Sequence, residues 1–247
     1  MGREMLFERR AYTLRPGARE TFWGLQRKWN TPVSFRPMLE HNIGYFATVA
    51  GPAERIVHLY RWDSYDQAKR NLAAITTPER MEYFVTARKL LLRQETAFLE
   101  AAPHAELSPI WGSGRDWRPG TPVFPNLDDP ATLAVTETVL DFVPGGVAVY
   151  WEGYRKLDDA TVEVTRQNLI GTFLVTTGPL HRVIQYRWFP NWQQAEKHRQ
   201  KLEESPSWSQ FVETYRPHVH ECHVAQLSPS PVPWMRPLFA AIDWSPK

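Results

Sequence analysis

The sequence predicts an α+β protein made of two tandem ferredoxin-like (βαββαβ) units. Two observations lead to this class. The same motifs occur twice in the same order along the 247 residues, and within each copy the apolar residues alternate between the period of a strand and that of a helix. We expect a first domain at 1–110, a linker at 111–130, a second domain at 131–229 and a Pro/Trp-rich tail at 230–247.

The duplication can be followed residue by residue. Residues 44–52, GYFATVAGP, return 127 positions later as residues 171–179, GTFLVTTGP. Residues 57–62, VHLYRW, match residues 183–188, VIQYRW, at a distance of 126 positions. We therefore expect the loop before this second match to be one residue shorter in the second copy.

Each copy begins with a strand and a helix. In the first copy the strand covers residues 5–14 and stops at a Pro-Gly turn signal. The helix behind it places Phe22, Leu25 and Trp29 at i, i+3, i+7 spacing, and the prolines that follow break or kink it.

A hairpin, a second helical stretch and a last strand complete each copy. Strands at 43–50 and 55–62 flank a Gly-Pro turn, and Ser64 begins the next helix with Gln67 at the capping-box position. This element order makes an antiparallel sheet with both helices on one face. We expect the two bare sheet faces to pack together, which gives a pseudo-dimeric α/β barrel.

Composition excludes several functional classes. The 29 Lys and Arg residues against 27 Asp and Glu residues leave a net charge of +2 without a basic block, so we expect no nucleic-acid partner. No apolar stretch approaches the roughly 20 residues of a membrane span, and a single cysteine fits a reducing compartment, so we expect a cytoplasmic protein. The motifs of nucleotide-dependent enzymes and serine hydrolases are missing.

A row of ionisable residues marks the first strand. Alternation places Glu8, Arg10 and Tyr12 on one face, and the matching positions of the second copy hold an uncharged set, Thr136, Thr138 and Leu140. A reactive pocket is therefore expected in the first copy.

The third strand adds a histidine and two aromatic residues. His58 shares a face with Tyr60 and Trp62, and the motif match gives His58 the counterpart Ile184. The aromatic pair returns in the second copy as Tyr186 and Trp188. Repetition favours a packing role for these four aromatic residues, which are also the candidates for contact with a substrate.

Two interpretations fit the polar set. In the functional one, His58 or Glu8 moves a proton in an aromatic pocket, while Arg10 and Tyr12 orient or stabilise an oxyanion. In the structural one, Glu8 and Arg10 form an ion pair where the sheets meet, and His58 is hydrogen-bonded in the core. The sequence does not tell whether the faces of the first and third strands point the same way.

A cluster near the C-terminus is a weaker candidate for a metal site. In a strand, His218, His220 and Cys222 fall on one face, as the ligands of zinc or copper would. The spacing lacks paired Cys-x-x-Cys units, and the first copy has no equivalent. Solvated or hydrogen-bonded histidines are favoured, and we expect neither a metal nor another cofactor.

Three stretches of the first copy carry a family resemblance. They are FERRAYTLRPG at residues 7–17, the strand from Gly44 to Gly51, and HLYRW at residues 58–62. These stretches resemble the NIPSNAP family of the dimeric α/β-barrel superfamily, and the second copy matches more loosely. The resemblance implies two ferredoxin-like units in one barrel. The superfamily includes cofactor-free oxygenases, cyclases, isomerases and haem-dependent enzymes, so the resemblance implies the fold more than the chemistry.

Three functions stay open on this basis. The first is a cofactor-independent enzyme that acts on a small hydrophobic or aromatic molecule by proton transfer, giving isomerisation, cyclisation or oxygenation. The second is a non-catalytic small-molecule-binding or scaffolding protein, and the third is a metal- or haem-dependent enzyme. The first needs a cavity of about 300 Å³ or more that reaches His58 or Glu8. Homo-oligomer formation is not demanded, but we expect the tail to clasp its own or a neighbouring chain through Trp234, Phe239 and Trp244.

Overall fold

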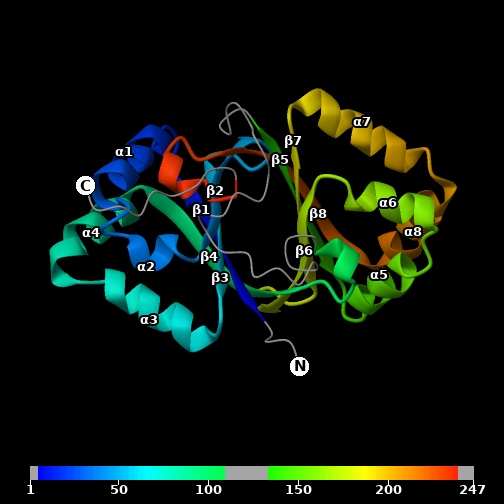
Figure 1. The fold of residues 1–247 in the computed structure, drawn as a ribbon, viewed down its shortest axis with the longest axis horizontal. Coiled ribbons are helices and arrows are strands. Elements are labelled where there is room, and N and C mark those ends of the chain that lie inside the picture. The colour runs from blue at the N-terminus through cyan, green and yellow to red at the C-terminus, as the bar shows by residue number, and fades with distance from the viewer. Residues whose placement is uncertain (1–4, 109–132, 239–247) are drawn as a thin grey trace. The chain divides into compact units, whose positions relative to one another are not determined.

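The computed structural model describes residues 5–108 and 133–238, which divide into two compact units (Figure 1). Unit 1 contains residues 5–98 and 228–238, and unit 2 contains residues 99–108 and 133–227. Each unit therefore includes a short segment that lies far from the rest of it in the sequence. The predicted linker, 111–130, and residues 239–247 of the predicted tail lie outside the described residues.

Unit 1 consists of strands with helices on one face (Figure 1). The strands are β1 (Leu6–Leu14), β2 (Asn42–Ala50), β3 (Arg55–Trp62) and the greater part of β4 (Leu91–Ala101), whose last three residues belong to unit 2. The helices are α1 (Arg19–Trp29), α2 (Arg36–Leu39), α3 (Tyr65–Ile75) and α4 (Met81–Lys89). β3 lies between β1 and β2 and pairs antiparallel with both.

Unit 2 repeats this order. Its strands are β5 (Ala134–Phe142), β6 (Leu169–Thr177), β7 (Arg182–Phe189) and the greater part of β8 (Val219–Pro229), whose last two residues belong to unit 1. Its helices are α5 (Gly146–Tyr154), α6 (Asp159–Arg166), α7 (Trp192–Glu203) and α8 (Pro206–Tyr215). β7 pairs antiparallel with β5 and β6, and β5 also pairs antiparallel with β8. Each helical connection of the βαββαβ pattern is thus divided into two helices.

The helix starts follow the predicted caps. The Ser64 hydroxyl accepts a hydrogen bond from the backbone N–H of Gln67 at 3.2 Å, and α3 begins there. The Asn191 side chain accepts one from the N–H of Gln194 at 3.0 Å, and α7 begins there. Such caps satisfy backbone donors that have no partner inside the helix. Local sequence therefore determines where these helices start.

The described part of the tail packs into unit 1. Val232 and Met235 have no exposed surface and belong to the core that α1, α2 and β3 form. The indole N–H of Trp234 donates to the carbonyl oxygen of Asn30 at 2.7 Å. The tail therefore clasps its own chain through these residues. Two of the expected clasp residues, Phe239 and Trp244, lie outside the described part of the chain.

The pairing of the strands corrects the comparison between the two copies. Arg10 lies opposite His58 in unit 1, and Thr138 lies opposite Gln185 in unit 2. Since Arg10 and Thr138 are equivalent, the counterpart of His58 is Gln185. The predicted counterpart, Ile184, is wrong.

The same correction applies to the aromatic motif. Glu8 pairs with Tyr60, and its equivalent Thr136 pairs with Arg187, so Tyr60 corresponds to Arg187 and not to Tyr186. β3 and β7 start 127 positions apart, at Arg55 and Arg182, which means that no loop residue is missing. A shift of one residue along a strand turns every side chain to the other face.

Candidate functional site

A cavity of about 500 Å³ lies between the strands and the helices of unit 1. The strands contribute the four residues that the sequence singled out for catalysis, together with one tyrosine of β2: Glu8, Arg10, Tyr12, His58 and Tyr45. The helical side is mainly aromatic and apolar and includes Phe22, Tyr65, Leu72, Tyr83 and Phe84. The cavity exceeds the minimum size of about 300 Å³ that was set for an enzyme site.

The faces of β1 and β3 point the same way. Arg10 is the direct partner of His58, and Glu8 is the direct partner of Tyr60. Directly opposite residues of an antiparallel pair lie on the same face of the sheet. The pairing thus answers the question that alternation within a single strand leaves open.

Glu8 is a buried carboxylate whose oxygens are already engaged. It accepts hydrogen bonds from Nε of Arg10 at 2.6 Å, from Nη2 of Arg10 at 3.1 Å and from the indole N–H of Trp62 at 2.9 Å. The ion pair of the structural interpretation is therefore present, but it faces the cavity and the helices of unit 1. Its geometry holds the Arg10 guanidinium in place.

Arg10 and Tyr12 supply a cation and a hydroxyl to the cavity wall. Burial works against the charge of Arg10, but the Glu8 carboxylate, together with Tyr12 and Tyr60, raises the pKa of Arg10 above its usual value. The guanidinium also lies over the ring of Tyr60, 5.1 Å from the centroid. Burial raises the pKa of Tyr12 to about 12, so its hydroxyl is protonated at neutral pH.

His58 is a buried, neutral imidazole. Burial and the positive charge of Arg10 hold the pKa of His58 well below its usual value. The ring stacks on Tyr45 with a centroid distance of 4.2 Å. Its Nδ1 lies 3.1 Å from the hydroxyl of Tyr60, which lies 2.6 Å from the hydroxyl of Tyr45, while Nε2 has no hydrogen-bond partner.

The predicted substrate-contact residues take different places. Tyr60 and Trp62 have no exposed surface and do not line the cavity, so they support the residues that do. Tyr186 and Trp188 line neither the cavity of unit 1 nor a second cavity in unit 2. Their positions alternate with those that face the helices of unit 2, and they lie on the other face of β7.

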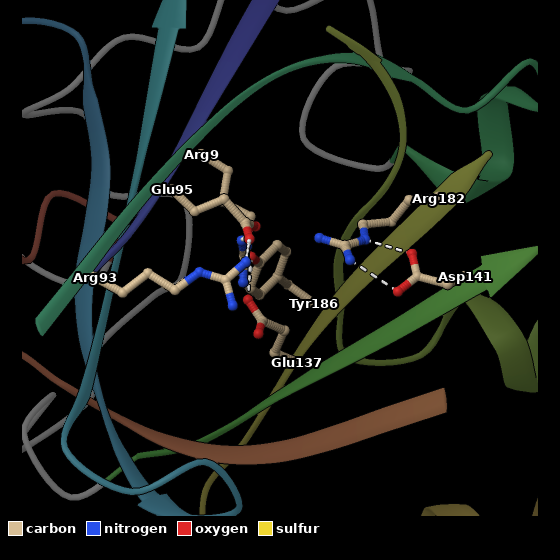
Figure 2. A network of polar contacts seen from close by, with 7 residues as sticks. All are labelled: Arg9, Arg93, Glu95, Glu137, Asp141, Arg182 and Tyr186. Atoms are coloured by element: carbon tan, nitrogen blue, oxygen red, sulfur yellow. Dashed lines mark hydrogen bonds and ion pairs between the residues drawn. The ribbon is translucent and has the colours of Figure 1, made fainter. Parts of the chain in front are cut away.

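Figure 2 shows the polar contacts on the strand faces that point away from the helices. In unit 1, Arg9 pairs with Glu95 at 3.2 Å. In unit 2, the hydroxyl of Tyr186 donates to a carboxylate oxygen of Glu137 at 2.6 Å. Tyr186 is thus tied to a buried polar contact, which explains why it cannot act as the aromatic equivalent of Tyr60.

The second cavity, of about 390 Å³, lies between the strands and helices of unit 2. The positions equivalent to the ionisable row, Thr136, Thr138 and Leu140, line it, and so does Arg187. Sequence reasoning missed Arg187, although the flanking repeats, 127 positions apart, would have aligned it with Tyr60. It also missed Tyr45, which follows the repeated Gly44 but is not part of a motif that would mark it as a functional residue.

The weaker candidate for a metal site, His218, His220 and Cys222, is spread over two elements. His218 ends a 3₁₀ helix (Arg216–His218) before β8 begins, whereas His220 and Cys222 lie exposed within the strand. Among the described residues, the metal-type ligand atoms that do lie within 4.8 Å of one another belong to Asp141, Glu221 and His223. Asp141 accepts from Arg182 at 2.8 Å, and Glu221 lies 2.9 Å from His223, so side-chain pairs account for this group.

Comparison with known proteins identifies the family. The family model described as NIPSNAP matches residues 7–106 and 136–233. The chain belongs to the NIPSNAP family. The two matched segments correspond to the two repeats, and the resemblance inferred from the first-copy motifs is confirmed. No curated protein matches the sequence at a significant level.

Solved structures similar to this NIPSNAP chain fall into two groups. A protein of Lactobacillus acidophilus NCFM that is proposed to be a monooxygenase is 10% identical, covers 97% of this chain and 100% of its own, and has a TM-score of 0.58. An anthrone oxidase-like protein is 13% identical, covers 97% of both chains and has a TM-score of 0.56. A NIPSNAP-like domain protein of Burkholderia xenovorans is 31% identical over 39% of this chain and 84% of its own, with a TM-score of 0.36.

The full-length similarities concern the fold. Together with the two family repeats, they confirm the predicted class, two tandem ferredoxin-like units of the dimeric α/β-barrel type. In the described residues, no helix combines the length and the apolar character needed to cross a membrane.

Proposed function

We propose that this NIPSNAP protein is a cofactor-independent enzyme that transfers a proton on a small, neutral, hydrophobic or aromatic molecule in the cavity of unit 1. The observation that supports it most is the state of His58, a neutral imidazole on the cavity wall with an unpartnered Nε2. A neutral imidazole is ready to accept a proton at pH 7, whereas an imidazolium is not.

In the proposed step, His58 acts as the base on a carbon next to a carbonyl group. Nε2 takes the proton, the electron pair of the C–H bond forms a C=C bond to the carbonyl carbon, the π pair of the C=O bond moves onto the oxygen, and an enolate forms. Arg10 and the hydroxyl of Tyr12 stabilise the negative oxygen. With a β,γ-unsaturated carbonyl compound the enolate is conjugated, so return of the proton from Nε2 to the γ-carbon isomerises the substrate, and the protein supplies every group that this step needs.

The hydroxyl groups of Tyr60 and Tyr45 determine which tautomer of His58 is present. Nε2 can accept a proton only if Nδ1 carries one and donates to the oxygen of Tyr60. The hydroxyl of Tyr60 also lies 2.6 Å from the hydroxyl of Tyr45, and either of the two can donate this bond. This chain makes Tyr60 a positioning residue for His58.

Glu8 has a supporting role in this scheme. Its carboxylate is engaged with Arg10 and Trp62, and we therefore assign the proton transfer to His58. The role of Glu8 is to position Arg10. Because the charges of Glu8 and Arg10 offset each other, the cavity suits a neutral molecule whose charge develops only during the reaction.

Proton transfer can be tested by deuterium exchange. A neutral bicyclic ketone such as 2-tetralone is incubated with the protein in heavy water, and mass spectrometry follows label at the carbon next to the carbonyl. We expect catalysed exchange, and a loss on the order of 10²–10⁴-fold in His58→Gln. The matched control is Gln185→Ala, at the equivalent position of unit 2, which should leave the rate unchanged. Exchange that is equal in wild type and His58→Gln would contradict the assignment.

A non-catalytic binding role is the second candidate, and one observation favours it. His58 is only 2% exposed, so a ligand reaches its ring only if the aromatic neighbours move. Tight binding of the ketone, measured by calorimetry, without any catalysed exchange would decide for this role.

A further inference from the structure

Arg187 is a buried guanidinium without an acidic partner among the described residues. It is 6% exposed and lines the cavity of unit 2. Its Nε donates to the side-chain oxygen of Gln185 at 3.1 Å, and its Nη1 donates to the carbonyl oxygen of Gln167 at 2.8 Å. Its Nη2 has no hydrogen-bond partner. Both acceptors are uncharged, so the positive charge is not neutralised.

An unpaired buried charge is costly and calls for an explanation. Removing an ion from water costs several kcal/mol, and interiors normally offset the cost with a counter-ion. Burial lowers the pKa of Arg187 to about 10, which still leaves the side chain charged at neutral pH. The equivalent of the acid Glu8 in this unit is Thr136, so this unit's own row supplies no carboxylate.

Other charged groups of the cavity do not reach Arg187. Glu196 on α7 also lines the cavity, but its carboxylate pairs with Arg199 at 2.6 Å, and both side chains are about half exposed. His198 lies on the same helix, and its Nε2 lies 3.0 Å from the carbonyl oxygen of Val164. Burial lowers the pKa of His198 to about 4, so it is neutral at pH 7.

The rest of the cavity has the character of a binding pocket for an apolar body. Around the guanidinium stand aromatic and aliphatic side chains from three helices and three strands, among them Tyr150, Trp192, Trp208, Tyr215, Val183 and Phe189. Such pockets bury the apolar part of a ligand and orient it with a few fixed polar groups. Here the fixed polar group is the Nη2 edge of Arg187.

We infer that the cavity of unit 2 binds a small monocarboxylate with an aromatic or apolar body, and that Arg187 is its counter-ion. The carboxylate accepts from Nη2, and the apolar body lies among the aromatic side chains. Nη2 suits this role because it belongs to a charged guanidinium, and hydrogen bonds between ionised groups are about twice as strong as those between neutral ones. The site is separate from the proton-transfer site of unit 1 and does not depend on it.

The test compares an acid with its neutral isostere. Binding of 2-naphthoate and of 2-naphthamide is measured by calorimetry. Hydrogen bonds to a charged group contribute about 1.5–3 kcal/mol, so wild type should prefer the acid by roughly 10–100-fold. Arg187→Met should abolish the preference and leave amide binding within about twofold.

Two controls separate this site from general effects. Arg199→Met removes a guanidinium from the same cavity wall, where Glu196 and Glu203 already pair with it, and should change the acid affinity by less than about twofold. His58→Gln should leave acid binding intact even if it abolishes proton exchange in unit 1. The inference is overturned if neither probe binds, if acid and amide bind equally to wild type, or if Arg187→Met keeps the preference.

Discussion

The two units place a buried guanidinium in equivalent cavities but treat its charge in opposite ways. In unit 1, Arg10 rises from β1 and is neutralised by Glu8 two residues away. In unit 2, Arg187 rises from the neighbouring strand, β7, and meets only uncharged acceptors. One fold can therefore hold a neutral cavity and a positive one, depending on a few inward-facing positions.

This difference separates the proposed ligands. A cavity whose charges cancel favours a neutral molecule on which charge develops in the transition state. A cavity with one unpaired cation favours a ligand that is already an anion. The comparison predicts that the two units bind different molecules, and the following variants test it.

The largest expected effect comes from Glu8→Gln. This change leaves Arg10 buried without its counter-charge and should lower the free energy of unfolding by about 3–5 kcal/mol. Arg187→Met is the matched variant, because it removes a buried charge that has no counter-ion; its stability should stay within about 1 kcal/mol of wild type or rise. Urea denaturation measures both. Equal losses in the two variants would mean that Arg187 has a counter-ion in the folded chain.

Tyr186→Phe should cause the second-largest loss of stability. The hydroxyl of Tyr186 donates to the buried carboxylate of Glu137, and a hydrogen bond to a charged group contributes about 1.5–3 kcal/mol. We expect a loss of stability of that size, with proton exchange in unit 1 unchanged. A measured loss below about 0.5 kcal/mol would contradict the role given to this hydroxyl.

Tyr60→Phe should have the opposite effect, with a small loss of stability and a large loss of proton exchange. Its hydroxyl lies between two neutral groups, so the loss of stability should be about 1 kcal/mol. The variant removes the acceptor that fixes the tautomer of His58, so exchange should fall by about tenfold or more. The pair Tyr60→Phe and Tyr186→Phe therefore checks the corrected register, since the sequence motif alone would treat the two tyrosines as equivalent.

The smallest effect concerns acid pH. Burial lowers the pKa of both His58 and His198 from 6.5, in the latter to about 4. The unfolded chain then binds protons first, and stability should decrease as the pH falls from about 6.5 toward 4. His58→Gln should make this decrease shallower. Thermal melts across this pH range measure it, and a curve unchanged by His58→Gln would show that the ring is not held neutral.

Much of the fold could be predicted because its signals are local. The caps at Ser64 and Asn191 act over three residues, and the alternation of Glu8, Arg10 and Tyr12 follows from the geometry of a single strand. These features do not depend on which strands pair. For the same reason the ionisable row was located correctly, and all of its members line the cavity.

The errors have a common physical origin in strand register. The motif YRW occurs in both copies, but a shift of one position puts Tyr60 on the helix side and Tyr186 on the other side. Composition cannot reveal this shift, because both faces of a strand buried on two sides carry large apolar residues. The same shift hid Arg187, which reaches the cavity only in the true register.

The sequence by itself determined the doubled order of elements, the helix starts and the family, because each of these is written in short stretches of neighbouring residues. Only the tertiary structure decided that His58 faces Arg10 across two strands, that Glu8 is already engaged, and that Arg187 has no acidic partner within 5–108 and 133–238. Contacts of this kind join residues far apart in the chain, and their energies depend on burial and distance, which exist only once the strands have paired.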